Sequence, residues 1–205
     1  MHEHIWRSFD IRGIAFQEIT VSFATQFGLA CAAYFRRRNV LQIAVGRDSR
    51  ISGEELTAAL IQGLVDGGMQ VFSLGVAPTP AVYFASSGYG FDAAVIVTAS
   101  HNPPEYNGFK IRLHNGPLHS DDYKEIRRDY DTAKPTKSGS FADIDLKGTY
   151  LKTIATLNPL PPNTTIAIDA GNGATSDWAP ELFERLGAKV LPLYCTPDGT
   201  FPNHP

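Results

Sequence analysis

The sequence has little of what marks several protein classes. It holds two cysteines among 205 residues, Cys31 and Cys195, and no Cys-x-x-Cys pair. Neither a disulfide framework nor a cysteine metal site is therefore indicated. Because Cys31 falls in a segment that we expect to form a buried helix, we expect no disulfide. A reducing compartment follows from this, so the expected location is cytoplasmic.

Long apolar runs and a strong charge excess are also missing. No stretch of about 18 apolar residues occurs, so we expect no membrane span. Met1 to Phe9 has no apolar centre and does not resemble a secretory signal. The formal net charge is −3, which excludes a nucleic-acid or membrane partner recognised through bulk charge. An anionic substrate would need a local basic cluster.

What the sequence does contain is the composition and the alternation of an α/β protein. Hydrophobic residues make up 43% and charged residues 19%, enough to build a core. Apolar runs with the spacing of helices and strands follow one another along the chain. Expected helices cover 20–37, 52–66, 79–88, a short segment from 120, 145–157 and 176–186. Expected strands cover 41–45, 70–74, 93–98, 109–113, 165–169 and 189–194. The fold class predicted is α/β, a layered mixed sheet with flanking helices.

Several local signals refine this pattern. Phe23, Phe27, Ala30 and Tyr34 lie on one face of the first long helix. The continuous apolar run Ala93–Thr98 predicts a strand buried on both faces.

Helix starts and turns have signals of their own. Ser52 precedes Glu55 with the spacing of a capping box, and Ser120 is a candidate cap for the short helix. Asn107-Gly108 favours a turn, after which the next strand would begin at Phe109.

Domain organisation follows from one polar segment. Asp131–Ser140 has little apolar content and contains Lys134, Pro135 and Gly139, so it is the linker candidate. We expect a first domain at 1–140, and a linker helix with the start of a second α/β domain at 141–205. The second part offers only strand, helix, strand, and two strands cannot cover their own edges. It therefore has the pattern of a truncated domain.

The segment with most chemistry follows the expected buried strand. Ser100 and His101 come directly after it, two prolines stiffen the loop, and Lys110 opens the next strand. A hydroxyl, an imidazole and an ammonium around one loop suit a nucleophile, a proton carrier and a charge stabiliser. A polar connection with no function remains the alternative at this point.

Five segments in order resemble the α-D-phosphohexomutase family, within it the phosphomannomutase/phosphoglucomutase group. They span nearly the whole chain, and the serine motif is the most specific of them. The segments are Phe9–Gly13, Gly46–Arg50, Thr98–Pro103, Asn107–Lys110 and Asp169–Gly173. Family members have four domains, so the resemblance implies domain one and the first part of domain two.

The resemblance implies a mutase that interconverts hexose 1-phosphate and hexose 6-phosphate. Ser100 would carry the phosphoryl group, and a hexose bisphosphate would be intermediate and activator. Mg²⁺ would be bound by the phosphorylated Ser100 and by aspartates that this chain lacks. The remaining mutase domains are expected after Pro205, so we expect the 205 residues alone to be inactive. Glu105–Lys110 is closer to the mannose/glucose group than to the glucosamine group.

The same resemblance assigns roles to three side chains. Arg12 would lie near the phosphoserine, although an ion pair with Asp10 is its alternative. Lys110 would stabilise charge or exchange protons at the transferring group. His101 would either assist proton transfer or hold the loop through hydrogen bonds, and the sequence does not separate these.

Other segments and other functions have simpler interpretations. The charged turn with Arg47, Asp48 and Arg50 is interpreted as an ion network that supports the site rather than as a substrate contact. Asp169–Gly173 is interpreted as a fold signature without a ligand. A serine hydrolase using Ser100 and His101 is disfavoured, because adjacent residues rarely give the base its geometry and no Gly-x-Ser-x-Gly elbow occurs. A non-catalytic binding or regulatory module derived from the mutase fold remains the second hypothesis.

Overall fold

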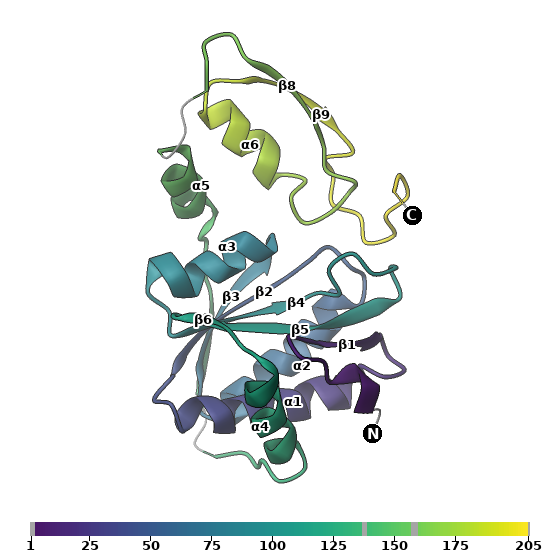
Figure 1. Ribbon diagram of the computed structural model, residues 1–205, viewed down its shortest axis with the longest axis vertical. Helices are drawn as coiled ribbons and strands as arrows, with labels where there is room; N and C mark the ends of the chain where they lie inside the picture. Colours follow the sequence, from purple (N-terminus) through teal and green to yellow (C-terminus); the bar gives the residue numbers. More distant parts are fainter. Residues whose placement is uncertain (1–2, 137–138, 157–159, 205) are drawn as a thin grey trace.

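A computed structural model describes residues 3–136, 139–156 and 160–204 of the chain (Figure 1). Met1 and Pro205, residues 137–138 of the expected linker and residue 157 of the expected helix lie outside the described part. The strands are β1 Ile11–Ile14, β2 Gln42–Arg47, β3 Gln70–Val76, β4 Ala93–Val97, β5 Tyr106–Leu113, β6 Gly116–Pro117, β7 Ser140–Asp143, β8 Thr165–Asp169 and β9 Lys189–Leu193. The α-helices are α1 Val21–Arg36, α2 Gly53–Asp66, α3 Thr79–Phe84, α4 Ser120–Tyr130, α5 Lys147–Ala155 and α6 Trp178–Arg185. A 3-10 turn Glu3–Ile5 precedes β1, and a π turn Ala85–Tyr89 extends α3.

The first part of the chain forms one mixed sheet. Its strand order is β1-β5-β4-β2-β3-β7, with β6 paired to β5. The pairs of β2 with β3 and β4, and of β3 with β7, are parallel, whereas β5 is antiparallel to both β4 and β1. The predicted class, a layered mixed sheet with flanking helices, is confirmed.

Helices cover both faces of this sheet (Figure 1). Helices α1, α2 and α4 lie on one face and α3 on the other. The first face holds the larger core, where Phe27 is fully buried against Phe23 and Phe109. The predicted apolar face of α1 is confirmed, since all four of its named residues are buried.

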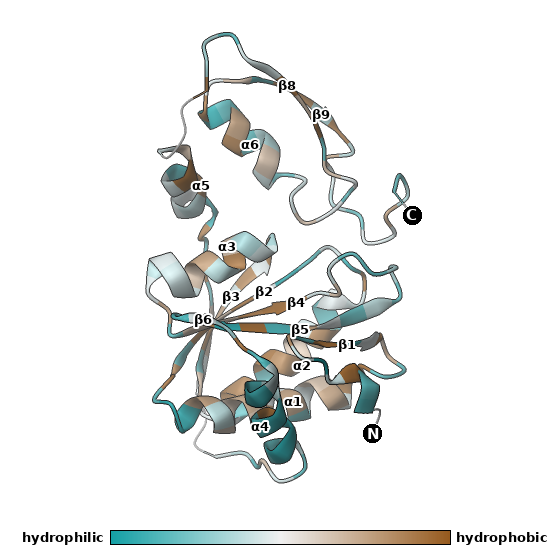
Figure 2. Ribbon diagram, in the orientation of Figure 1, coloured by the Kyte–Doolittle hydropathy of each residue, from teal (hydrophilic) through white to brown (hydrophobic). Residues whose placement is uncertain are grey.

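Strand β4 lies in the middle of the sheet and positions the site. All five of its residues are buried, which confirms burial on both faces. Figure 2 shows it as a brown arrow, while α4 is mostly teal along its length. Strand β4 is buried because β2 and β5 flank it and helices cover both faces of the sheet.

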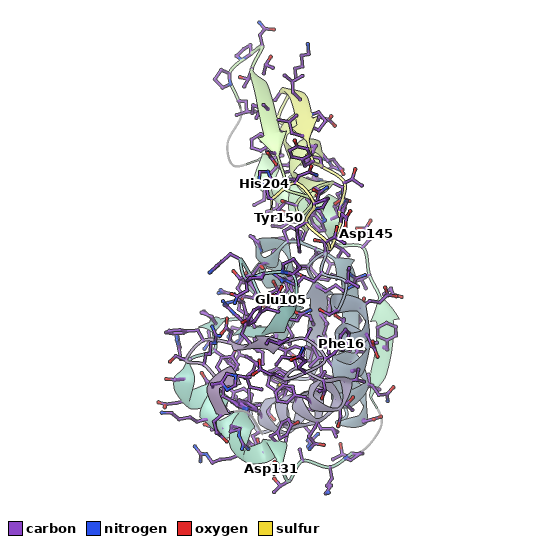
Figure 3. The ribbon with its side chains drawn as sticks, turned by 90° about the vertical axis from the view of Figure 1, so that its right-hand side faces the viewer. Phe16, Glu105, Asp131, Asp145, Tyr150 and His204 are labelled. Atoms are coloured by element: carbon purple, nitrogen blue, oxygen red, sulfur yellow. The ribbon has the colours of Figure 1, made fainter. Side chains whose placement is uncertain are left out.

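The second part of the chain stacks on the face of α3. Strands β8 and β9 form a separate parallel pair. The apolar contacts of this second part are concentrated at the junction where it meets α3. There Leu146, Leu151 and Trp178 pack in one cluster with Ala81 and Val82. Figure 3 shows Asp145 and Tyr150 at this junction and His204 above it.

Two turn and cap predictions are wrong. Asn107 and Gly108 lie inside β5 and make no turn. The side-chain amide of Asn107 is held there, because it donates to the Ser52 hydroxyl at 2.8 Å. A Cβ on Gly108 would collide with the carbonyl oxygen of Ile11, so glycine is needed where β1 approaches closely. Ser52 makes no capping bond, since its hydroxyl accepts that bond from Asn107 instead.

The chain also adds two edge strands that the sequence analysis did not contain. Residues 11–14 form β1, in which Gly13 pairs with Asn107. At the end of the expected linker, β7 begins at Ser140 and pairs with β3. Ser120 is the first residue of α4 rather than its cap, because the backbone N–H of the preceding residue donates to Asp122 at 2.9 Å.

Cys31 and Cys195 are both free thiols. Within the residues described, none of the helices has the length and apolar character needed to cross a membrane.

Candidate active site around Ser100

Ser100 is exposed and follows β4 after two residues. Its backbone has φ of +60°, a left-handed conformation that costs a non-glycine residue on the order of 1–2 kcal/mol. Its hydroxyl lies 3.3 Å from Nδ1 of His101, which is also exposed. The Ser100 hydroxyl thus lies at the surface. The left-handed backbone conformation of this residue must be stabilised by neighbouring groups.

The loop after Ser100 is held from inside by Arg50. This arginine is 2% exposed, and its Nε donates to the Asp48 carboxylate at 3.1 Å. Its terminal nitrogens donate to backbone carbonyls of the serine loop. The predicted ion network is therefore present for Arg50 and Asp48, whereas the guanidinium of Arg47 pairs with Glu54 at 3.9 Å. The guanidinium of Arg50 is directed at the serine loop rather than at solvent.

A second charged cluster is built on β1 and β5. The Asp10 carboxylate accepts from Arg12 at 2.5 Å and from Lys110 at 2.8 Å, both on Oδ2. Arg12 also donates to the side chain of Asn102 at 2.6 Å, so the cluster touches the serine loop. In the ladder Arg12 is opposite Gly108, two residues before Lys110 on β5, so both cations lie on one face of the sheet.

The electrostatics of this cluster favour its charged form. Burial on its own would raise the pKa of Asp10, but the hydrogen bonds and charges of Lys110 and Arg12 outweigh burial. The pKa of that carboxyl therefore lies below its ordinary value of 3.8. The three side chains leave one formal positive charge on this face of the sheet. Arg12 thus makes the ion pair with Asp10 that was its alternative, but it does so with a side chain only 11% exposed.

A hollow of about 350 Å³ adjoins Ser100 and His101. Its other walls come from the turn after β2, the start of α3 and Gly173–Thr175 of the second part. The first and second parts of the chain are in contact next to this hollow. The hydroxyl of Ser49 donates to the Asn172 carbonyl at 3.2 Å, and the Phe201 ring lies 5.6 Å from the Arg50 guanidinium.

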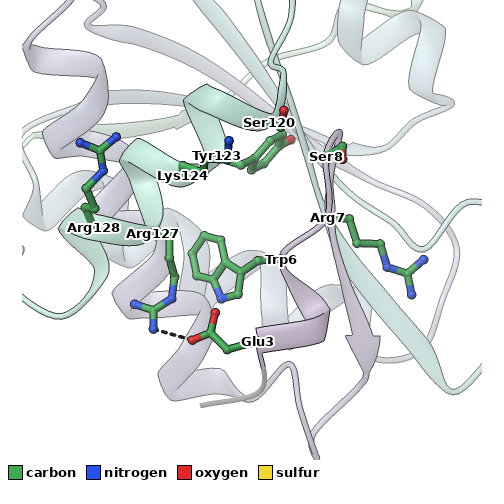
Figure 4. A pocket seen from close by; sticks show the side chains of 9 residues that line it. All are labelled: Glu3, Trp6, Arg7, Ser8, Ser120, Tyr123, Lys124, Arg127 and Arg128. Atoms are coloured by element: carbon green, nitrogen blue, oxygen red, sulfur yellow. Dashed lines mark hydrogen bonds and ion pairs between the residues drawn. The ribbon is translucent and has the colours of Figure 1, made fainter.

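A larger hollow of about 510 Å³ lies between the N-terminal segment and α4 (Figure 4). Four basic side chains line it, but Arg7 and Arg128 point away from each other, and Arg127 is paired with Glu3 at 3.0 Å. Ser8 and Ser120 also line it, but within the described part of the chain neither hydroxyl is hydrogen-bonded to a proton carrier as Ser100 is to His101. The hollow next to Ser100 is therefore the better candidate site.

Metal ligands are a separate matter. Among the residues that the structure describes, no group of three or more His, Cys, Asp or Glu side chains could hold an ion. The described residues do not make the Mg²⁺ site that the resemblance implies.

Sequence reasoning gave Asp10 as a possible partner of Arg12, since residues two apart on an extended segment share a face. It missed the bond from Lys110 to the same carboxylate, and it missed Asn102 as the contact from Arg12 to the loop. No sequence signal shows that Arg50 reaches carbonyls about 50 positions away.

Comparison with known proteins agrees with this geometry. Residues 4–137 match the family described as phosphoglucomutase/phosphomannomutase, alpha/beta/alpha domain I, and residues 149–205 match its domain II. A phosphomannomutase/phosphoglucomutase of Pseudomonas aeruginosa is 39% identical over 98% of this chain and 43% of its own length. A phosphoglucomutase of Neisseria meningitidis is 40% identical over 98% of this chain and 44% of its own.

A solved structure shows the same fold at full coverage. A phosphoglucomutase/phosphomannomutase family protein of Burkholderia thailandensis superposes with a TM-score of 0.94 and 34% identity, over 100% of this chain and 46% of its own. The chain thus spans less than half the length of these relatives. From the two domain matches, the ordered motifs and the shared fold, this chain belongs to the phosphoglucomutase/phosphomannomutase family.

Proposed function

We propose that the chain is the phosphoserine-bearing part of a phosphohexomutase that exchanges hexose 1-phosphate and hexose 6-phosphate. The observation that carries this is Ser100, whose hydroxyl is exposed at the end of a buried strand beside His101. Mannose and glucose phosphates are the proposed substrates, since the relatives are named for these two sugars. A cytoplasmic location and further mutase domains after Pro205 belong to the same proposal.

The proposed reaction moves one phosphoryl group at a time. A free hydroxyl oxygen of the hexose phosphate attacks the phosphorus on Ser100, the bond from phosphorus to the serine oxygen breaks, and a bisphosphate forms. After the sugar turns over, its other phosphate returns to the Ser100 oxygen. The proton lost by the attacking hydroxyl needs a carrier, and His101 at 3.3 Å from the serine oxygen is our candidate.

Charge compensation is the second task of such a site. A phosphoserine carries about −1.5 to −2 charges near neutral pH. Arg12 and Lys110 are the cations we assign to it, and both are held in place by Asp10. Phosphoryl transfer depends mainly on positioning and charge stabilisation, which is what a buried ion cluster and a clamped loop supply.

We keep Mg²⁺ within the proposal as an ion that the phosphorylated Ser100 would help to bind. The other ligands would be aspartates beyond the 205 residues, since the described residues hold no such group. No step is assigned to the ion here. For the same reason we propose that the 205-residue chain has no mutase activity by itself.

The alternatives are a hydrolase and a non-catalytic module. A serine triad needs a third group that orients the histidine, and among the contacts of the described residues His101 meets only the Ser100 hydroxyl. A binding module derived from the mutase fold would need no presented nucleophile. The cation cluster that contacts the serine loop through Asn102 favours the mutase.

Replacing the hydroxyl tests the proposal. In the full-length protein, Ser100→Ala should abolish turnover of glucose and mannose phosphates, and incubation with hexose bisphosphate should leave its intact mass unchanged. The wild type should gain the mass of one phosphoryl group. Ser87→Ala is the matched control, because Ser87 is exposed and its hydroxyl only bonds the Tyr83 carbonyl. Near-normal turnover by Ser100→Ala would assign the phosphoryl group to another residue.

A further inference from the structure

The left-handed backbone of Ser100 needs a cause, because a residue with a Cβ does not adopt it without help. Both backbone polar groups of Ser100 are engaged. Its N–H donates to the Thr98 hydroxyl at 2.9 Å, and its carbonyl accepts from Nη2 of Arg50 at 3.1 Å.

These two partners are themselves joined through one carboxylate. The Thr98 hydroxyl donates to Oδ2 of Asp48 at 2.6 Å, and Nε of Arg50 donates to the same oxygen at 3.1 Å. The contacts therefore close a ring that runs from Ser100 through Thr98, Asp48 and Arg50 back to Ser100. A change of φ at Ser100 would break the ring.

Arg50 does more than close the ring. Its remaining N–H groups donate to the carbonyls of Asn102 at 2.6 Å, Pro103 at 2.5 Å and Tyr106 at 3.0 Å. With the bonds to Asp48 and Ser100, all five donors of the guanidinium are used. Four of the five acceptors are carbonyls within one loop of seven residues, 100–106.

We propose that Arg50 is a positioning residue that fixes the left-handed conformation of Ser100 and so sets where the serine hydroxyl is presented. It needs no contact with substrate. Lysine could not replace it, because an ammonium has three donors and no planar fork. The part of the proposal that concerns turnover depends on the proposed mutase function, whereas the part that concerns backbone geometry does not.

Arg47 is a matched control from the same turn. It is three residues earlier. Its guanidinium donates to the Asp48 carbonyl at 3.3 Å and makes a long pair with Glu54 at 3.9 Å. It makes no bond to the serine loop among the described residues. Arg47→Lys should therefore leave the geometry of Ser100 and the turnover unchanged.

The first measurement reads the backbone directly. In the isotope-labelled 205-residue chain, a strong NOE between the amide and α protons of Ser100 reports positive φ. We expect it in the wild type and in Arg47→Lys, and we expect it to be lost in Arg50→Lys. Thr98→Val removes the ring's hydroxyl while keeping the side-chain shape, and should also lose the NOE, whereas Thr98→Ser should retain it. If Arg50→Lys does not fold, the two Thr98 variants decide.

The second measurement separates positioning from plain stability. In the full-length protein, folded Arg50→Lys should lower kcat by about 10²-fold, the order expected for a misplacement of about 1 Å, with little change in KM. A folded Arg50→Lys or Thr98→Val that keeps the strong NOE would overturn the proposal. So would a lost NOE with unchanged kcat. A wild type without mutase turnover would refute the proposed function instead, and the NOE comparison would still decide the role of Arg50.

Discussion

Strands β4 and β8 each have five residues and three or more apolar side chains, yet their environments differ. Every residue of β4 is buried, whereas β8 alternates between exposed and half-buried positions. The difference comes from their neighbours, because β4 has a strand on each side, whereas β9 is the only partner of β8 among the described residues. An apolar run thus predicts a strand, but the strands beside it decide how deep it lies.

The largest expected contrast is in amide hydrogen exchange. The amides of β4 should exchange only on global unfolding, which for a free energy of at least about 5 kcal/mol slows exchange more than ~10³-fold. The amides of β8 should exchange through local opening and be protected far less. Hydrogen exchange by mass spectrometry or NMR measures both in one sample. Equal protection in the two strands would show that the second part is as stable as the first.

A pair of leucines sharpens the same contrast. Leu64 is fully buried in the first core, and Leu64→Ala should lower the free energy of unfolding by about 2–5 kcal/mol. Leu193 on β9 is 49% exposed, so Leu193→Ala should cost no more than about 1 kcal/mol. Urea denaturation followed by circular dichroism gives both values. Similar costs would mean that β9 is covered in solution.

The two tryptophans allow the parts to be followed separately. Trp6 packs on Phe23 and Phe27 of the first core, and Trp178 packs on Tyr150 at the junction. In urea, the fluorescence of Trp178 in Trp6→Phe should change at lower concentration than that of Trp6 in Trp178→Phe. Coincident midpoints, after correction for the cost of each substitution, would indicate a single cooperative unit.

The smallest effect concerns two carboxylates with lowered pKa values. Burial on its own would raise the pKa of Asp10, but Lys110 and Arg12 lower it below its ordinary value. His204 and the Gly171 N–H lower the pKa of Asp169, whose side chain is 39% exposed. The stabilisation from ionised Asp10 is present above its ordinary pKa of 3.8 and is lost as pH falls through its lower folded pKa. Carboxyl-carbon NMR titration should show that about 1 M salt, with a Debye length of roughly 3 Å, reduces the shift of Asp169 much more than that of Asp10. Asp10→Asn should remove the acid-sensitive contribution of the cluster that Asp10 forms with Arg12 and Lys110.

What the sequence predicts well is what depends on local pattern. The periodic apolar face of α1, the buried run of β4 and the end of α6 before Gly187 are all confirmed. These features follow from spacing alone, without knowledge of the neighbours.

What the sequence does not predict depends on distant partners. Asn107-Gly108 has the chemistry of a turn, but the Ser52 hydroxyl and the close approach of β1 place it within a strand. The short strands β1 and β7 carry weak patterns and exist because longer strands offer an edge to pair with. Ser100 could be named from its motif, whereas the carbonyls that Arg50 binds could be found only from the fold.

The contact between the two parts gives Gly199 a use in engineering. A Cβ at this position would collide with the carbonyl oxygen of Ser49 and would lie 2.6 Å from the amide nitrogen of Ile51, both in backbone. Side chains of increasing size at position 199 would thus act as spacers that push the second part off the first in steps. Small-angle scattering of Gly199→Ala and Gly199→Leu would read those steps as a growing radius of gyration.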